Sequence, residues 1–272
     1  MRLILIHGIN QQGRSSKSIL HDWLLHLANP ACLKGVEVVA PFYGDVLAEQ
    51  TAATPEQAVA QGIPREDEER DFVANALQQL ALDRGLTDEM ISNEQIVTQG
   101  PLDDRRLLAI LRLLERVSPL QGSAVLLLVR QAYAYLKRNH VADAVDSIVE
   151  PALAQGPCAV VGHSLGSVVG FKLLRKLGQT VPLFLTLGSP LGLVAVQSAL
   201  KRPRRVPVGV ARWFNGLDPD DAVTLGKPLT AETFAAGIVN KTDIENGEEA
   251  HAIKGYFADP VVRQEICSGV VS

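Results

Sequence analysis

Short apolar runs and longer amphipathic stretches alternate at both ends of the chain. Apolar runs bounded by turn residues are typical of buried strands, whereas apolar residues spaced three or four apart are typical of helices. The runs that predict strands are residues 2–7, 35–44, 158–164, 181–190 and 206–216. The stretches that predict helices are residues 18–30, 141–156 and 165–178. This order predicts an α/β fold with a mostly parallel sheet flanked by helices.

The middle of the chain, about residues 51–140, has no convincing strand pattern. Helical spacing recurs at residues 66–85, 102–119 and 124–139. The last two stretches are apolar over more than half of their circumference, so they must pack against other elements. We therefore expect one domain, residues 1–272, with a helical insertion at about 51–140. The insertion either buries its own apolar surface or covers an active site, and the two roles are compatible.

Composition and charge narrow the class of protein. Hydrophobic residues make up 47% of the 272 residues, which is enough for a large core. The net charge is −4 and no block of like charges runs long, which argues against nucleic acid or an anionic membrane as the main partner. The basic cluster "KRPRR" (201–205) is short and is expected to be a solvated loop. No apolar run has the length of a transmembrane segment, and residues 1–6 are too short for a signal-peptide core.

The cysteines lead to an expectation about the compartment. Cys32, Cys158 and Cys267 are odd in number and far apart, so they predict neither a disulfide framework nor a CxxC metal site. A reducing compartment fits this pattern. Together with the hydropathy pattern, it predicts a soluble, cytoplasmic protein.

A serine lies between two glycines where a predicted strand meets a predicted helix, in "AVVGHSLGSVVG" (159–170). A residue on so tight a turn has a strained backbone, and its neighbours two positions away must lack side chains, as Gly162 and Gly166 do. The turn points the Ser164 hydroxyl toward the unpaired N–H groups of a helix N-terminus. The alternative is an ordinary turn with a serine cap. The flanking strand and helix favour the nucleophile elbow, G-x-S-x-G.

A nucleophilic serine needs a general base, and the base needs an acid that orients it. On this kind of fold the chain order is Ser, then Asp or Glu, then His. Of the six histidines, only His251 follows Ser164. A single late histidine is usually a surface residue, but the order makes His251 the candidate base.

The stretch "RWFNGLDPDDAV" (212–223) follows a predicted strand and offers three candidates for the acid: Asp218, Asp220 and Asp221. Such turn aspartates often only solvate a loop, and the residues alone leave the choice among the three open. Later carboxylates are weaker candidates because no predicted strand delivers them. These are Glu232, Asp243, Glu245, Glu248 and Glu249.

An oxyanion hole would complete this chemistry. One donor is expected to be the backbone N–H of Leu165, directly after the nucleophile. The other is expected from "IHGIN" (6–10), where Gly8 lets the backbone approach closely and Ile9 N–H donates. His7 either orients this loop by a side-chain hydrogen bond or is a buried polar residue with no catalytic part. We favour the first, and we do not expect His7 to be the base.

With these motifs in order, the chain resembles the α/β-hydrolase superfamily, specifically its bacterial lipase- and esterase-like members. The matching stretches are "HGIN" (7–10), "GHSLGS" (162–167), "TLGSPLG" (186–192), "WFNGLDPDDAV" (213–223) and "HAIKGYF" (251–257). Similar proteins carry W-x-N followed by D-P-x-D-x-V, with the acid at the second aspartate. The resemblance therefore implies Asp221 as the acid, with Asp218 ranked second. It also implies the Leu165 and Ile9 donors, no metal and no organic cofactor.

The chain also departs from this superfamily. It begins directly at the strand that carries His7 and Gly8, so the first two, antiparallel strands are expected to be missing. The helical stretch follows the second predicted strand, which is earlier than in many caps.

The expected function is a serine hydrolase acting on a small-molecule or lipid carboxylic ester through an acyl-enzyme intermediate. Ser164 attacks, His251 takes and returns the proton, and Asp221 orients the imidazole. Thioesterase and acyltransferase chemistry use the same residues. The alternative from another class is a non-catalytic binding domain on the same fold. Such a domain usually lacks a triad member, and none is missing here. The sequence does not indicate the oligomeric state.

Overall fold

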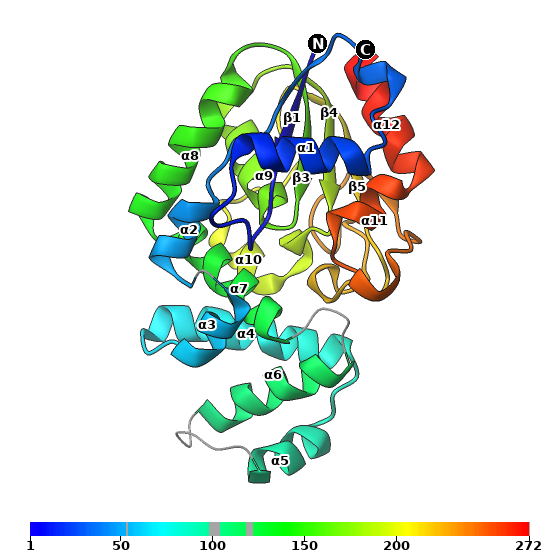
Figure 1. The fold of residues 1–272 in the computed structure, drawn as a ribbon. Coiled ribbons are helices and arrows are strands. Elements are labelled where there is room, and N and C mark those ends of the chain that lie inside the picture. The colour runs from blue at the N-terminus through cyan, green and yellow to red at the C-terminus, as the bar shows by residue number, and fades with distance from the viewer. Residues whose placement is uncertain (53, 98–103, 118–121, 272) are drawn as a thin grey trace.

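The computed structural model describes residues 1–52, 54–97, 104–117 and 122–271. Its centre is a six-stranded sheet with the order β2-β1-β3-β4-β5-β6, and every pairing in it is parallel. The strands are β1 (Arg2–Ile6), β2 (Glu37–Val39), β3 (Cys158–His163), β4 (Val181–Leu187), β5 (Val210–Gly216) and β6 (Ile238–Lys241). The predicted α/β architecture, a parallel sheet flanked by helices, is confirmed (Figure 1).

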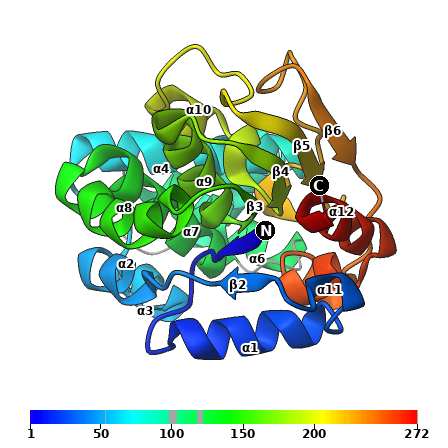
Figure 2. The ribbon, with the colours of Figure 1, turned by 90° about the horizontal axis from the view of Figure 1, so that it is seen from above.

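Helices cover both faces of the sheet because the strand residues alternate between two apolar clusters. Leu3 and Leu5 of β1 belong to one cluster, and Ile4 and Ile6 belong to the other. Figure 2 shows α8 and α9 on one side of the sheet and α11 and α12 on the other. The first cluster includes residues of α1 (Ser16–His26), α11 (Ile253–Ala258) and α12 (Pro260–Val271). The second includes residues of α8 (Asn139–Ala154), α9 (Leu165–Leu177) and α10 (Val194–Ala199).

Between β2 and β3 the described residues form helices and loops. The helices before α8 are α2 (Gly44–Gln50), α3 (Pro55–Gln61), α4 (Asp67–Asp83), α5 (Asp88–Val97), α6 (Arg105–Val117) and α7 (Gly122–Lys137). Figure 1 shows α3 to α6 beyond one end of the sheet, with α5 and α6 farthest from it. Helices were predicted where α4, α6 and α7 lie, although residues 102, 103, 118 and 119 of the predicted α6 stretch fall outside the described residues. The pattern missed α2, α3 and α5.

A buried carboxylate ties α4 to the end of α7. The side chain of Glu69 is only 4% exposed, and its Oε1 accepts a hydrogen bond from Arg130 Nε at 3.0 Å. Its Oε2 accepts one from Arg138 Nη2 at 2.7 Å. This cluster therefore connects α4 to α7 and to the residue that follows it, and removing either arginine would leave the buried charge of Glu69 less well compensated.

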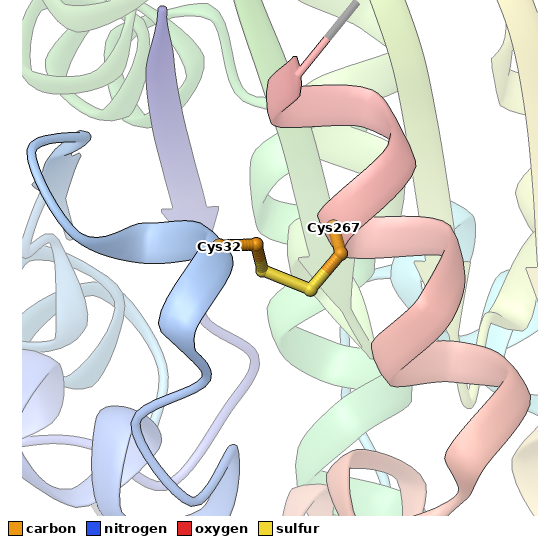
Figure 3. The surroundings of a disulfide bond; sticks show 2 residues. All are labelled: Cys32 and Cys267. Atoms are coloured by element: carbon orange, nitrogen blue, oxygen red, sulfur yellow. A yellow bond between two sulfur atoms is a disulfide. The ribbon is translucent and has the colours of Figure 1, made fainter.

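The expectation that the cysteines form no disulfide is wrong. Cys32 and Cys267 are disulfide-bonded although 235 residues separate them in the sequence (Figure 3). Cys32 lies in η1 (Ala31–Leu33), which packs against α12, the helix that carries Cys267. Tertiary packing therefore brings together two cysteines that are far apart in the sequence. Cys158 remains a free, buried thiol. Disulfides persist mainly in oxidising compartments, so the cysteines do not support the prediction of a cytoplasmic location.

The hydropathy pattern predicts no membrane-spanning segment. None of the helices in the described part of the chain combines the length and the apolarity that crossing a bilayer requires.

Candidate active site

Ser164 lies on the tight turn that the sequence predicts between β3 and α9. Its backbone φ is 54° and its ψ is −128°, a left-handed conformation that is strained in any residue with a Cβ atom. A Cβ on Gly162 would lie 2.7 Å from the Cα of Ser167. A Cβ on Gly166 would collide with the carbonyl oxygen of Ile6. Both glycines are therefore sterically required.

Ser164, His251 and Asp221 form one hydrogen-bonded chain. Asp221 precedes η4 (Ala222–Thr224) in the segment after β5, and His251 lies between η5 (Gly247–Glu249) and α11. The Nδ1 atom of His251 lies 2.8 Å from Asp221 Oδ2, and Nε2 lies 2.9 Å from Ser164 Oγ. A carboxylate only accepts, so Nδ1 carries the proton and Nε2 is free to accept the serine proton. This geometry is the one by which a base activates a hydroxyl.

The three candidate aspartates point in different directions. The side chain of Asp221 is buried and reaches His251. Asp218 instead holds its own loop: Oδ1 accepts from Asp220 N–H at 2.7 Å, and Oδ2 accepts from Asn246 N–H at 2.7 Å. Asp220 is exposed. The structure therefore places Asp221 at the histidine, whereas Asp218 connects two loops.

The later carboxylates lie elsewhere. Asp243 follows β6, a strand that the sequence analysis missed, so its premise that no strand delivers this residue is wrong. The Asp243 side chain is 80% exposed and pairs with Lys241. Glu232 accepts a hydrogen bond from Thr230, and Glu245 is exposed. Glu248 and Glu249 line the cavity described below.

A residue that the sequence analysis did not single out also contacts Asp221, the candidate acid. Tyr256 is completely buried, and its hydroxyl donates to Asp221 Oδ2 at 2.7 Å. Burial raises the pKa of this phenol well above its usual value, so it remains a donor throughout the working pH range. The available signal was an aromatic residue shortly after the candidate base, in "HAIKGYF".

His7 holds the loop that is expected to supply an oxyanion donor. The backbone N–H of Tyr43 donates to His7 Nε2 at 3.1 Å, so Nδ1 carries the proton and donates to the Gly8 carbonyl at 2.8 Å. Burial lowers the pKa of His7 to about 4, which keeps the ring neutral. In a trans peptide the C=O and N–H point in opposite directions, so this bond turns Ile9 N–H away from the His7 ring.

The Gly8 backbone closely approaches Ser164. A Cβ at Gly8 would lie 2.6 Å from Ser164 Cβ and 3.1 Å from its Oγ. Leu165 is the first residue of α9, where backbone N–H groups have no partner within the helix. The donor roles of Ile9 and Leu165 stay predictions, because they concern a bound reaction intermediate.

A second histidine supports the candidate base from the side. The Nε2–H of His163 donates to the backbone carbonyl of His251 at 2.8 Å, and the two ring centres lie 4.9 Å apart. Burial, followed by the neighbouring His251, lowers the pKa of His163 to about 3. His163 is therefore a neutral support rather than a second base.

A cavity of about 800 Å³ opens onto Ser164. Part of its wall comes from the helical stretch, through residues 54–56 at the start of α3 and Ala124 of α7. Its lining also includes apolar side chains such as Trp23 and Ile253. We call Glu56, Glu248 and Glu249 the acidic rim, because all three line the cavity and are exposed. Among the lining residues that the structure describes, none is a lysine or an arginine.

The site was also examined for metal ligands and for known relatives. Within the described ranges, no three histidine, cysteine or carboxylate side chains gather where they could hold a metal ion. The absence of a cofactor stays a prediction from the resemblance.

Comparisons with protein-family models and with curated protein sequences found no match for this chain. A function for this chain is therefore inferred from its motifs, its fold and the geometry of the site.

Proposed function

We propose that this chain is a serine hydrolase with an α/β-hydrolase fold, which cleaves a carboxylic ester through an acyl-enzyme intermediate. The observation that carries the proposal is the hydrogen-bonded chain from Asp221 through His251 to Ser164. The parallel sheet and the strained serine turn are what this fold requires at the nucleophile. In this proposal the chain is one domain, and the helical stretch caps the cavity.

The proposed reaction has two halves. Ser164 Oγ attacks the ester carbonyl carbon while His251 Nε2 takes the hydroxyl proton and Asp221 stabilises the imidazolium. The N–H groups of Leu165 and Ile9 hold the oxyanion. Collapse of the tetrahedral intermediate releases the alcohol, which receives the proton from His251, and leaves an acyl group on Ser164. Water, deprotonated by the same histidine, then releases the acid and restores the serine.

The cavity supports a small-molecule or lipid ester as the substrate. Its volume of about 800 Å³ accommodates both an acyl group and an alcohol group. The apolar side chains of Trp23 and Ile253 suit the hydrocarbon part of a substrate, and the acidic rim disfavours an anionic one.

The decisive experiment is labelling of the purified protein with a fluorophosphonate probe, followed by hydrolysis of p-nitrophenyl esters of increasing chain length. We expect labelling of the native protein, and loss of labelling in Ser164→Ala, in His251→Ala and after heat denaturation. Loss of a triad member should lower kcat by about 10⁴-fold or more. Ser147→Ala, at an exposed position on α8, and His140→Ala are the matched controls and should label normally.

A folded, native protein that does not label would contradict the proposal and favour a binding domain. Equal labelling of Ser164→Ala would show that another residue reacts. An activity restricted to thioesters would retain the triad and change the substrate class.

A further inference from the structure

The two oxygens of the Asp221 carboxylate accept three hydrogen bonds of different kinds. Oδ1 accepts the backbone N–H of Val223 at 2.9 Å, which fixes the carboxylate at the start of η4. Oδ2 accepts both His251 Nδ1–H at 2.8 Å and Tyr256 Oη–H at 2.7 Å. The oxygen that faces the candidate base is therefore shared with a phenol.

The direction of the Tyr256 bond is set by its other partner. The backbone N–H of Asp218 donates to the same phenol oxygen at 3.2 Å, which occupies a lone pair and leaves the single phenol proton for Asp221. Tyr256 is fully buried on α11, the helix that begins directly after the His251 turn. One short segment thus supplies both groups that bond to Asp221 Oδ2.

We propose that Tyr256 is a positioning residue that weakens the pull of Asp221 on the protonated ring of His251. The inference rests on the proposed function, in which His251 must be neutral to act as the base. A donor that bonds to a carboxylate oxygen stabilises its negative charge and leaves less of that charge for a second donor on the same oxygen. In this proposal His251 loses its proton at a lower pH than it would without the Tyr256 hydroxyl. The neutral ring is then available as a base over a wider pH range.

The other titratable groups around this pair are accounted for. His163 donates to the His251 carbonyl and stays neutral, as its lowered pKa of about 3 requires. The backbone N–H of Asp218 donates to the Tyr256 hydroxyl, and the Asp218 carboxylate accepts the backbone N–H of Asn246. His7 acts electrostatically on His163, and the acidic rim (Glu56, Glu248, Glu249) lines the cavity. All of these ionisable side chains are still present in a Tyr256→Phe variant.

The substitution Tyr256→Phe removes the hydroxyl and keeps the ring. We expect the acid limb of the kcat/KM–pH profile to move to higher pH by about one unit, because the full carboxylate charge then favours the imidazolium. At a pH on that limb kcat/KM should fall about tenfold, the size expected for one hydrogen bond to a charged group. KM should change little, because Tyr256 is not among the residues that line the cavity.

Tyr135 provides a matched control elsewhere in the protein. It is also fully buried, and its hydroxyl donates to a carboxylate, Asp146 Oδ1, at 2.8 Å. Tyr135→Phe should lower the unfolding midpoint to a similar degree and leave the acid limb where it is. A purely structural role for Tyr256 would make the two variants behave alike.

A second variant tests the same hydrogen bond if Tyr256→Phe does not fold. Site-specific 3-fluorotyrosine at position 256 retains the bond and makes the phenol a stronger donor. It should move the acid limb in the opposite direction, to lower pH.

A readout that needs no turnover separates this inference from the proposed function. The Nδ1 proton of His251, assigned by its absence in His251→Gln, is followed by proton NMR as a function of pH. The ring should take up its second proton at a higher pH in Tyr256→Phe than in the unsubstituted protein. If no ester is hydrolysed but this titration moves, the proposed function fails, whereas the effect of Tyr256 on His251 is confirmed. If esters are hydrolysed and neither the acid limb nor the NMR titration moves, the inference is overturned.

Discussion

Reduction of the Cys32–Cys267 disulfide should destabilise the protein strongly. The bond connects η1 to α12 and closes a loop across 235 residues of sequence. In the chain-entropy treatment, cross-linking residues so far apart lowers the entropy of the unfolded chain by the equivalent of about 5 kcal/mol at 25 °C. Measured values are commonly smaller, so we expect the free energy of unfolding to fall by about 3–5 kcal/mol. Without the bond, α12 is held by apolar contacts of buried residues such as Val262 and Ile266.

The assay is urea unfolding followed by tryptophan fluorescence. Trp23 and Trp213 are both buried and belong to the clusters on opposite faces of the sheet, so the signal reports on both layers. We expect reductant to lower the midpoint of the unsubstituted protein by about 1 M urea or more, given the slope typical of proteins. Cys32→Ser should show the lowered midpoint with or without reductant.

Thiol counting provides the control. Alkylation of the unfolded, non-reduced protein should modify Cys158 alone, because it is the free cysteine in the described residues. The reasoning is refuted if the unsubstituted protein unfolds at the same urea concentration with and without reductant. It is also refuted if all three cysteines react before reduction.

Three further outcomes follow from the site. Gly8→Ala places a Cβ 2.6 Å from the Cβ of Ser164 and should lower kcat about 100-fold, as loss of an oxyanion donor does. The circular dichroism spectrum should be unchanged, and a normal kcat would rule out the close approach. The pKa values of His7 and His163 are lowered from 6.5 to about 4 and about 3, so the unfolded chain binds more protons and the free energy of unfolding should fall as the pH drops below about 6.5. Urea midpoints measured against pH test this, and His163→Gln should flatten the dependence. The double substitution of Glu248 and Glu249 by glutamine should lower the kcat/KM of a choline ester about threefold and spare its neutral 3,3-dimethylbutyl analogue; equal effects on both would exclude electrostatic selection.

The local features of this protein were predictable because they depend on neighbouring residues. An apolar run predicts a buried strand, and two glycines on either side of a serine predict the tight turn that requires them. Gly162 and Gly166 flank Ser164 because a Cβ at either position would collide with the adjacent backbone. His251 could be selected because a chain order, rather than a contact, excluded the other histidines.

The edge strand β6 and the disulfide were not predictable in this way. The β6 segment "IVNK" is short and partly exposed, so it lacks an apolar pattern and is defined by its pairing with β5. Cys32 and Cys267 bond because η1 and α12 pack together. In both cases the partner comes from a distant part of the chain.

The candidate acid shows most clearly what the residues alone could not determine, although the resemblance implied Asp221. Asp218 and Asp221 occupy one short turn after β5, both are buried, and both residue types could orient an imidazole. The choice between them depends on the direction of each side chain. The backbone N–H of Asn246 donates to the Asp218 carboxylate, and the turn after η5 brings His251 to the Asp221 carboxylate. From the sequence alone we could predict the tight turn at Ser164 and a candidate chemistry for the site. Only the tertiary structure decided which acid, which phenol and which cysteine pair meet, because those contacts form between segments that have no local signal in common.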